Sequence, residues 1–565
     1  MTLTSEYFLA NSLWIASDWR KTRAFFCALH NPRATQQSRL VSLLRKNARS
    51  VYGRRYGFER LKTIRDYQAA VPIVTYDSLQ DEIEAIRQGR CGVLTDEPII
   101  WMEKTAGSTS ASKYIPCTAS LKREFQAAVA PWISDLYSQR AKMRFGASYW
   151  SITPLAEKRE RTPGGLPVGC EDERDYFGRW ARTLLDRLIL TPPEIARIMD
   201  VDCARYVTLR FLLATPHLSF ISVWNPSFLT LLMRFLERDA ERLIADLRQG
   251  TLTVEPKIPA QLKQSLARRI VPAPRRASEL EAILREHGRL MPSEVWPNLT
   301  LISCWASANA RVFVPELQSV FPEVEIQPKG LLATEGIVSI PLLGHKGGVP
   351  ALTSHFFEFV PEESSSEHPL LVDEIEIGGI YRVIITTGGG LYRYDLGDLV
   401  EVVGRVAGTP MIEFVGKAGH VSDLCGEKLH GARVEAVLHE ALSQLQLTPS
   451  FAMIAPESGQ PPSYVLFLDS PELPEGLFDG LVGTIESGLF EGHHYSYCRR
   501  LGQLAPLRGI RVQNGARSYL ERCTALGQRL GSVKPMGLHC HTGWSSWFQT
   551  TAENKNREKN EPLRL

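Results

Sequence analysis

The stretch that decides the fold reads IIWMEKTAGSTSASKYIPCT and runs from Ile99 to Thr118. It joins an apolar run typical of a β-strand to a long helical pattern, for which Ser120 is the expected N-cap. Between them, a run of small or hydroxyl-bearing residues, Thr105 to Ser112, ends at Lys113. Backbone N–H groups, hydroxyls and a lysine in one short loop before a helix favour phosphate binding. The loop lacks the Gly-Lys-Ser/Thr ending of a Walker A motif, and a surface linker is the alternative.

Strands and helices alternate along the chain on the carboxyl side of this loop. Strand-like apolar runs occur at 148–153, 218–224, 299–307 and 324–334, and residues 227–247 have helical spacing. Such alternation predicts an α/β fold with a mainly parallel sheet. A β-rich stretch follows, containing YRVIITT and LYRYDLGDLVEVVG on either side of a glycine turn.

After MIEFVGK the pattern restarts on a smaller scale. The helical runs ARVEAVLHEALSQL and FDGLVGTIESGLF alternate with the strand-like runs SYVLFLD and GIRVQN. This organisation predicts a large N-terminal domain and a small α+β C-terminal domain. The expected ranges are 1–415 for the large domain, 416–423 for a hinge, 424–540 for the small domain and 541–565 for a flexible polar tail.

The bulk properties exclude several classes of protein. The 565 residues carry a formal charge of only +3, which gives no general attraction for nucleic acid or an anionic membrane. The basic run Lys263 to Arg276 is interpreted as a solvated helix face and connector. Ten scattered cysteines without a CxxC pair favour a reducing compartment. With no basic leader and no run of about 18 apolar residues, the expected location is cytoplasmic.

Two further motifs place a carboxylate where it can bind part of a nucleotide. In KGLLATEG, Glu335 follows an apolar strand and is a candidate Mg²⁺ ligand, because Mg²⁺ takes hard oxygen ligands. A helix N-terminal glutamate is the alternative. In LYRYDLGDLV, Asp398 follows a glycine and can accept both hydroxyls of a ribose. For Arg393 and Asp395 in the same motif, a surface pair of little energetic weight is an equal alternative.

The last motif is GQRLGSVKP, in which Lys534 lies on a glycine-flanked turn and Pro535 keeps it off a regular helix. An isolated lysine of this kind is ordinarily a surface residue. It gains meaning from its order in the chain, since it follows the hydroxyl loop, the Thr-Glu-Gly motif and the Tyr-Arg-x-x-x-Gly-Asp motif.

These four motifs in this order resemble the Gretchen Hagen (auxin-responsive promoter) family of acyl-acid amido synthetases. That family is part of the adenylate-forming superfamily, with acyl-CoA synthetases and luciferase. The blocks VPIVTYDSL, WPNLTLISCW and FPEVEIQPKGLLATEG carry the same resemblance, which spans roughly residues 20 to 540 and favours the bacterial branch. The hydroxyl loop departs from the family pattern in having Ala111 and Ser112 where a glycine is usual.

The resemblance implies a role for each motif residue. The β- and γ-phosphates of ATP would lie along the hydroxyl loop, Thr334 and Glu335 would meet the α-phosphate and Mg²⁺, and adenine would lie beside the backbone of 331–334. Asp398 would hold the ribose, Lys417 would be the basic hinge residue, and Lys534 would reach the reacting carboxylate. The loop residues in question are Ser108, Thr109, Ser110 and Lys113.

The implied activity is ATP-dependent adenylation of a carboxylic acid, followed by acyl transfer to an amine, an amino acid in most of the family. ATP and Mg²⁺ are the implied cofactors, and the partners are small molecules rather than nucleic acid or membrane. Two alternatives keep the same scaffold: an acyl-CoA synthetase with a thiol nucleophile, and a non-catalytic nucleotide- or acyl-binding relative.

Overall fold

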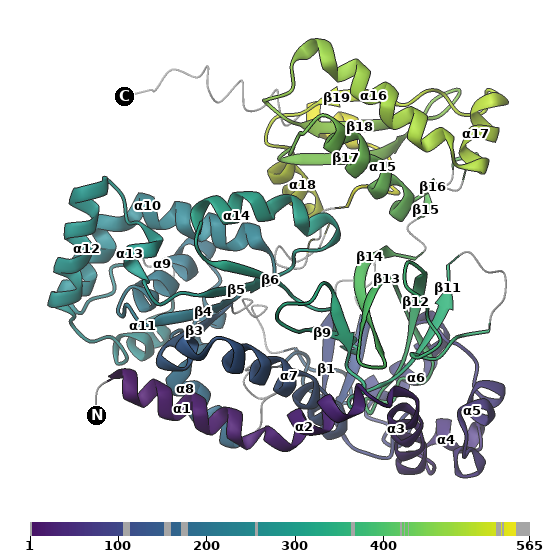
Figure 1. Cartoon of the computed structure of the whole chain (residues 1–565), viewed down its shortest axis with the longest axis horizontal. Helices are drawn as coiled ribbons and strands as arrows, with labels where there is room; N and C mark the ends of the chain where they lie inside the picture. The colour runs from purple at the N-terminus through teal and green to yellow at the C-terminus, as the bar shows by residue number, and fades with distance from the viewer. Residues whose placement is uncertain are drawn as a thin grey trace. The chain divides into compact units, whose positions relative to one another are not determined.

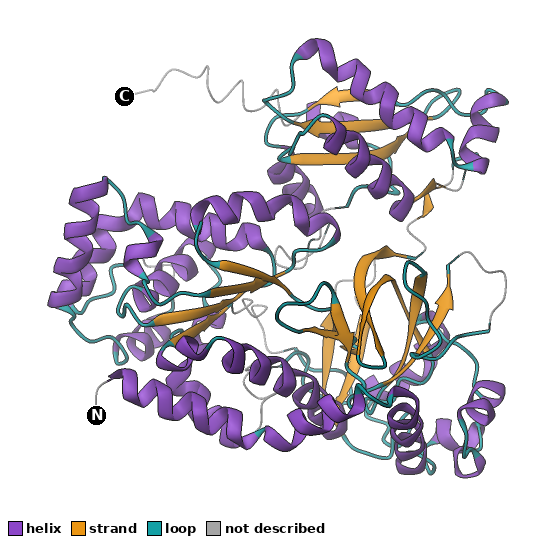
Figure 2. Cartoon of the chain, viewed as in Figure 1, coloured by secondary structure: helices purple, strands orange, loops and turns teal. Residues whose placement is uncertain are grey.

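The structure is a computed structural model that describes residues 3–105, 113–151, 160–170, 179–254, 258–362, 368–418, 421–422, 424–425, 427, 429–526, 533 and 536–549. The chain forms two compact units, each of which mixes helices with strands (Figures 1 and 2). The first consists of Met1–Ala306, Val314–Leu396 and Val400–Phe414. The second consists of Ser307–Phe313, Gly397–Leu399 and Val415–Leu565.

The first unit begins with helices whose starts follow from the local sequence. Pro32 occupies the first turn of α3, where its missing N–H costs no hydrogen bond, and the Asn31 side chain accepts the Ala34 N–H. Thr63 and Asp66 form a reciprocal capping box at the start of α5. The six helices are α1 (Leu3–Ser17), α2 (Trp19–Ala28), α3 (Pro32–Lys46), α4 (Val51–Arg55), α5 (Ile64–Ala70) and α6 (Gln80–Arg87).

The stretch at 99–118 forms a β-hairpin instead of a strand that leads straight into a helix. Strand β1 (Ile99–Thr105) pairs antiparallel with β2 (Lys113–Thr118), and Thr105 lies opposite Lys113. Helix α7 (Ala119–Gln139) begins only after β2, and the side chain of its N-cap, Thr118, accepts the Leu121 N–H. The expected N-cap at Ser120 is therefore wrong, because the strand continues to the residue before the helix. The residue that ends the hydroxyl loop, Lys113, therefore begins a strand and not a helix.

The expected parallel sheet is confirmed in the first unit. Its four strands lie in chain order, and every neighbouring pair is parallel: β3 (Ala147–Trp150), β4 (Leu218–Ser222), β5 (Leu301–Cys304) and β6 (Glu325–Pro328). All four carboxyl ends therefore meet at one edge. The helices of this region gather around the sheet (Figure 1), namely α8 (Arg179–Leu188), α9 (Val201–Leu212), α10 (Pro226–Gln249), α11 (Ala260–Ala267), α12 (Pro274–His287), α13 (Pro292–Val295) and α14 (Val314–Val320).

One arginine of the basic run at 263–276 is not solvated. Arg276 is buried, and its guanidinium donates to the carbonyls of Leu213 and Val295. It thereby joins the start of α12 to the end of α9 and to α13. The interpretation of the whole run as a solvated face is wrong at this residue.

The β-rich part of the first unit is a six-stranded sheet beside a two-stranded hairpin. The order in the sheet is β11 (Phe356–Pro361), β12 (Ile380–Thr386), β13 (Tyr394–Val406), β14 (Thr409–Lys417), β10 (Gly348–Pro350) and β9 (Ser339–Pro341). The hairpin pairs β7 (Leu332–Ala333) with β8 (Gly336–Ile337). One hydrophobic core joins the sheet to the N-terminal helices, and it includes Leu40, Tyr67, Phe356, Phe357 and Val383.

Arg393 and Asp395 do not form a surface pair. Arg393 is 4% exposed, and its Nε donates to Glu358 Oε2 at 3.0 Å. Asp395 instead lies 3.1 Å from Arg382. Arg393 has a left-handed backbone (φ 46°) just before β13, so the strand alternation that would put it on one face with Asp395 does not apply.

The second unit contains a small mixed sheet covered by helices. Its central strand, β18 (Ser463–Asp469), pairs antiparallel with β17 (Phe451–Glu457) and parallel with β19 (Arg508–Arg511). The other elements are β15 (Val421–Ser422), β16 (Leu429–His430), α15 (Gly431–Gln444), α16 (Glu475–Phe490), α17 (His493–Arg500) and α18 (Gly515–Ala525). Trp544 is fully buried, and Phe548 packs on Phe467 at 5.0 Å. Residues 544–548 therefore belong to this core and not to the flexible tail expected from 541.

None of the helices within the described ranges combines the length and the apolar character that crossing a lipid bilayer requires.

Candidate active site

Glu335 stands at the tip of the β7–β8 hairpin. The pairs Leu332–Ile337 and Ala333–Gly336 leave Thr334 and Glu335 as the two turn residues, both half-buried. The helix N-terminal alternative for Glu335 is therefore excluded. The Tyr394 hydroxyl donates to Glu335 Oε1 at 3.4 Å. Burial, together with the nearby Glu335 charge, raises the pKa of Tyr394 well above its ordinary value, so Tyr394 stays protonated and remains a donor.

Two glycines fix the position of this hairpin. A Cβ on Gly330 would lie 2.0 Å from the Ser339 carbonyl oxygen, so only glycine fits where the chain enters the hairpin. A Cβ on Gly336 would lie 2.7 Å from Nε2 of the buried His355. The backbone around Glu335 is thus packed directly on its neighbours, and the carboxylate is held at a defined place.

A buried polar cluster lies behind the hairpin. Glu124 on α7 accepts the Gly388 N–H at 2.9 Å and the Arg39 guanidinium, and its Oε2 lies 3.1 Å from His355 Nδ1. Glu124 is 3% exposed, so these interactions are screened little by water. The cluster joins α7, the glycine turn before β13 and the residue against which Gly336 packs.

Lys113 and its neighbour Tyr114 both contact Tyr76. The Tyr114 N–H donates to the Tyr76 hydroxyl at 2.8 Å, and Lys113 Nζ lies 5.4 Å from the centre of the Tyr76 ring. Two residues before Tyr76, Val74 forms a bridge with Tyr394, which bonds Glu335. Within the first unit, Lys113 is therefore linked to Glu335 through the segment 74–76 and Tyr394.

Asp398 and Lys417 form an ion pair in the second unit. Lys417 Nζ lies 2.7 Å from Asp398 Oδ1, and the Asp398 side chain is only 5% exposed. The sequence assigned these residues separately to the ribose and the hinge, whereas the structure pairs them. The candidates Ser108, Thr109, Ser110 and Lys534 lie outside the described residues.

Sequence reasoning overlooked Tyr394 and Tyr76. Tyr394 stands inside the motif LYRYDLGDLV, in which the charged residues are the more obvious candidates. Tyr76 lies in VPIVTYDSL, which carried the family resemblance without any assigned role. A signal for Tyr394 existed in the motif itself. The contact of Tyr76 with β2 depends on pairing between distant segments, which no local pattern reveals.

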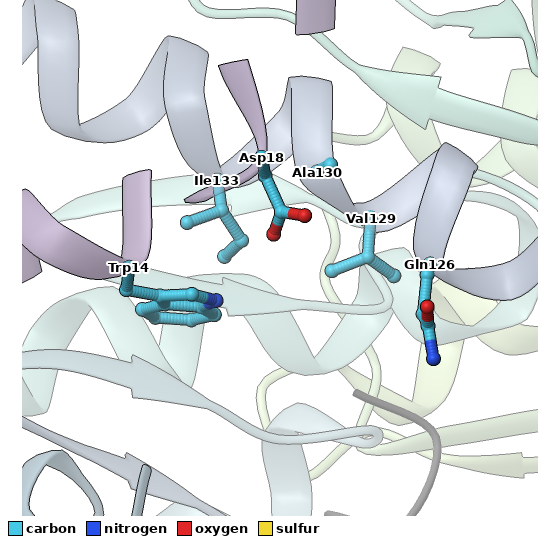
Figure 3. Close-up of a pocket in the computed structure, with 6 residues that line it drawn as sticks. All are labelled: Trp14, Asp18, Gln126, Val129, Ala130 and Ile133. Carbon is cyan, nitrogen blue, oxygen red and sulfur yellow. The ribbon is translucent and has the colours of Figure 1, made fainter. Parts of the chain in front are cut away.

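Two surface hollows lie away from these residues. One, between α1 and α7, is lined by Trp14, Asp18, Gln126, Val129, Ala130 and Ile133 (Figure 3). Its free volume of about 10 Å³ holds no more than one water molecule. The other, on an outer face of α3, is wide and open and is lined by residues from Ala34 to Lys46. Neither is lined by Lys113, Glu335 or Asp398.

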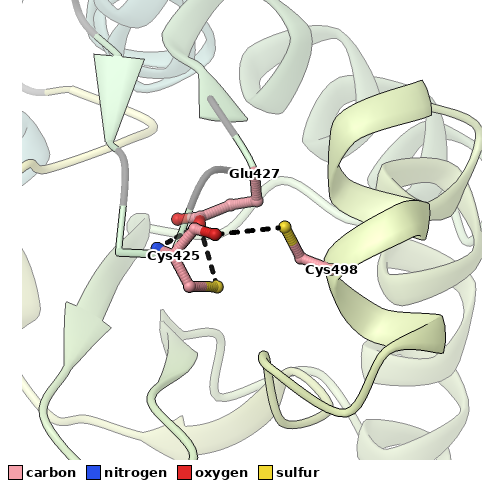
Figure 4. A group of neighbouring side chains, drawn as sticks. All are labelled: Cys425, Glu427 and Cys498. Atoms are coloured by element: carbon pink, nitrogen blue, oxygen red, sulfur yellow. Dashed lines mark hydrogen bonds between the residues drawn. The ribbon is translucent and has the colours of Figure 1, made fainter.

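Cys425, Glu427 and Cys498 are the one group of three potential metal ligands found in the described part of the chain (Figure 4). The Glu427 carboxylate already accepts the N–H groups of Leu424 and Cys425 at 2.7 and 2.8 Å and the Tyr464 hydroxyl at 2.6 Å. The Cys425 thiol donates to Glu427 at 3.3 Å. Because these four donors already occupy the Glu427 carboxylate, the three residues form a hydrogen-bonded cluster and not a preformed metal site.

Glu427 is expected to make the second unit sensitive to acid. Burial raises the pKa of Glu427, but the hydrogen bonds from Tyr464, Leu424 and Cys425 outweigh burial and leave the pKa below its ordinary 4.5. A depressed folded-state pKa adds stability above pH 4.5 that is lost as pH falls through the folded value. Glu427→Gln should therefore lower the free energy of unfolding by about 1–3 kcal/mol at pH about 7, and this difference should shrink as the pH falls below 4.5.

The measurement is urea unfolding of the wild type and of Glu427→Gln across this pH range. A spectroscopic probe in the second unit monitors the unfolding. Glu491→Gln serves as the matched control, because Glu491 pairs with Arg433 but is 73% exposed. If Glu427→Gln lowers the free energy of unfolding by the same amount down to the lowest pH, Glu427 does not have the depressed pKa assigned to it.

A family model described as the GH3 family N-terminal domain matches residues 22–326, and one described as the GH3 family central domain matches residues 348–417. The first alone spans more than half of the chain, and the chain therefore belongs to the GH3 family. Indole-3-acetic acid-amido synthetase GH3.10 of Arabidopsis thaliana is 24% identical over 500 residues, which cover 81% of this chain and 83% of that protein. Jasmonoyl--L-amino acid synthetase JAR6 of Nicotiana attenuata is 22% identical over 531 residues, which cover 88% and 90%.

The solved structure of the AtGH3.15 acyl acid amido synthetase in complex with 2,4-DB has the same fold. The match has a TM-score of 0.81 at 19% identity and covers 94% of this chain and 95% of that one. It confirms the expected fold class. The two named sequence relatives are plant proteins and give no support to the expected bacterial branch.

Proposed function

We propose that this protein is a ligase that activates a carboxylic acid with ATP to an acyl adenylate and then transfers the acyl group to an amine, giving an amide. An amino acid is the proposed amine. The observation that carries the proposal is the connection from Lys113 through the segment 74–76 and Tyr394 to Glu335, which links two of the nucleotide motifs of a GH3 family chain. The related proteins named as amido synthetases support the same reaction class.

The chemistry requires a better leaving group than a carboxylate oxygen. Attack of the carboxylate on the α-phosphorus of ATP releases pyrophosphate and makes AMP the leaving group for the amine. Lys113 would neutralise the departing pyrophosphate, and Lys534 would offset charge where the carboxylate meets the α-phosphate. Such electrostatic effects contribute roughly 3 kcal/mol for one well-placed group.

Glu335 fits a Mg²⁺ ligand in three respects: it is an oxygen donor, it is half-buried, and it lies at a turn fixed by packing. The ion would supply positive charge to the phosphate oxygens. Around it we assign Ser108, Thr109 and Ser110 to the β- and γ-phosphates and Thr334 to the α-phosphate. Asp398, which forms an ion pair with Lys417, would take the ribose.

The domain assignment is part of the same proposal. A large domain over 1–415 would bind ATP and the acid, and a small domain over 424–540 would carry Lys534 and move about a hinge at 416–423 between the two half-reactions. A reducing, cytoplasmic location is proposed as well, which suits ten free thiols.

The direct test is ATP–pyrophosphate exchange with a panel of aromatic, fatty and jasmonate-like acids, followed by mass spectrometry of products formed with mixed amino acids. Exchange together with an acid–amino acid amide supports the proposal. Exchange with a thioester formed from CoA, and no amide, would identify an acyl-CoA synthetase instead. No exchange with any acid would identify a non-catalytic binding protein.

Lys534→Ala is expected to separate the two half-reactions. Adenylation should slow by about 100-fold or more, because the lysine offsets charge only in that step. Amide formation from a preformed acyl adenylate should change by less than about 10-fold. Arg517→Ala, which removes an exposed charge of the same unit, is the control. Equal losses in both steps would contradict the assigned role of Lys534.

A further inference from the structure

Lys329 lies in a cage of aromatic rings at the carboxyl end of β6. Its Nζ is 5.3 Å from the ring centre of Trp132 on α7 and 5.2 Å from that of Trp224, which follows β4. Nζ also donates to the Ser222 hydroxyl at 2.6 Å. An ammonium within about 6 Å of a tryptophan face is attracted to the ring. The positive charge is therefore held at one place between three separate segments of the first unit.

Further tryptophans extend the aromatic surface along the same edge of the parallel sheet. Trp150, at the end of β3, lies edge-on to Trp132 at 6.0 Å, and Trp305, just after β5, lies 5.6 Å from Trp224. Trp150, Trp224 and Trp305 are half-buried, so part of each remains open to solvent. Ligands of α/β sheets bind outside the carboxyl ends of the strands. Among the described residues, this edge combines flat aromatic surface with the Lys329 ammonium.

The cage and Glu335 lie at opposite ends of the β7–β8 hairpin. The Lys329 N–H bonds the Cys304 carbonyl at 2.8 Å, before the hairpin begins, whereas Thr334 and Glu335 form its tip. At about 3.3 Å per extended residue, the five steps from Lys329 to Thr334 span up to about 17 Å. Up to that length of chain can separate a ligand group that pairs with Lys329 from the carboxylate that reacts at the tip.

We propose that the cage is a subsite for the far end of the acid substrate, and that this substrate is a planar aromatic carboxylic acid with a second anionic group. The ring would stack on the tryptophans, and the second anion would pair with Lys329. The inference rests on the proposed function, because it takes the other carboxylate to be activated near Glu335. A lysine that only packs the core would affect folding and not the choice of acid.

The test compares phenylacetate with its para-carboxy derivative in wild type, Lys329→Met and Lys329→Arg. By pyrophosphate exchange, Lys329→Met should lower kcat/KM for the dicarboxylate by about 10-fold or more and for phenylacetate by less than about 3-fold. Lys329→Arg should restore part of the loss, because it keeps the charge. Lys346→Met removes an exposed lysine of the same unit and should change neither value. Equal losses for both acids, or no loss, would overturn the proposal.

A second readout does not depend on the reaction. Titration of each acid into the protein without ATP is followed by tryptophan fluorescence, since three half-exposed tryptophans line the edge. Weaker binding of the dicarboxylate to Lys329→Met, but not of phenylacetate, supports the subsite even if the wild type shows no exchange. Failure of exchange alone would thus reject the proposed function. Unchanged binding of the dicarboxylate, or no binding to the wild type, would reject the subsite.

Discussion

Glu335→Gln is expected to abolish magnesium-dependent pyrophosphate exchange, with a loss of about 100-fold or more. The amide keeps the size of the side chain and an oxygen that can accept the Tyr394 hydroxyl, but it removes the negative charge that would bind Mg²⁺. The half-buried hairpin turn should therefore fold as in the wild type. Exchange rates across a range of Mg²⁺ concentrations, with thermal unfolding of the same samples, provide the measurement.

Two variants give this result its meaning. Glu323→Gln removes an exposed carboxylate from the loop before β6 and should leave exchange unchanged. Tyr394→Phe removes only the hydroxyl that contacts Glu335, so a loss below about 10-fold is expected. If Glu335→Gln retains most of its exchange activity, Glu335 has no metal role. If it loses activity and stability together, the loss comes from folding.

The two central strands of the parallel sheet, β4 and β5, were predictable because they are buried on both faces. Residues 218–222 and 301–304 are apolar or small throughout and are bounded by turns, as β4 and β5 require. The hairpin at 99–118 was not predictable from local sequence. Its second strand, KYIPCT, contains a proline and continues directly into α7, so the helical pattern masked the strand. Pairing of Thr105 with Lys113 is a non-local contact that periodicity does not report.

In the candidate site too, some residues have a local sequence signal and others depend on pairing between distant segments. Glu335 was found from its motif, because a carboxylate after a strand carries a local signal. Its neighbour Tyr394 and the lysine cage at Lys329 depend on which strands lie together. Arg393 was a candidate for a surface pair because charged residues are seldom buried without a partner. Its partner, Glu358, lies on another strand, and no local pattern in the sequence indicates the pair.

Arg393→Met is expected to lower the free energy of unfolding of the first unit by about 3–5 kcal/mol. The guanidinium donates to Glu358 at 3.0 Å and to the carbonyls of Gln68 and Val71 at 2.9 and 2.6 Å. Glu358 is fully buried, and burial raises its pKa despite the opposing charge of Arg393. Loss of the arginine leaves this carboxyl group without its charge partner in an apolar surrounding. Urea unfolding monitored in the first unit gives the difference.

A double variant distinguishes two contributions to the free energy of unfolding. One is the destabilisation from a buried carboxyl group without its partner, and the other is the stabilisation from the ion pair itself. Arg393→Met with Glu358→Leu should be less destabilised than Arg393→Met alone, because no charge is then left buried. Arg382→Met is the matched control, since Arg382 on β12 pairs with Asp395 on β13 of the same sheet but its side chain is 37% exposed. Its loss should stay below about 1 kcal/mol. Equal losses for Arg393→Met and Arg382→Met would show that burial of the Arg393 pair carries no energetic weight.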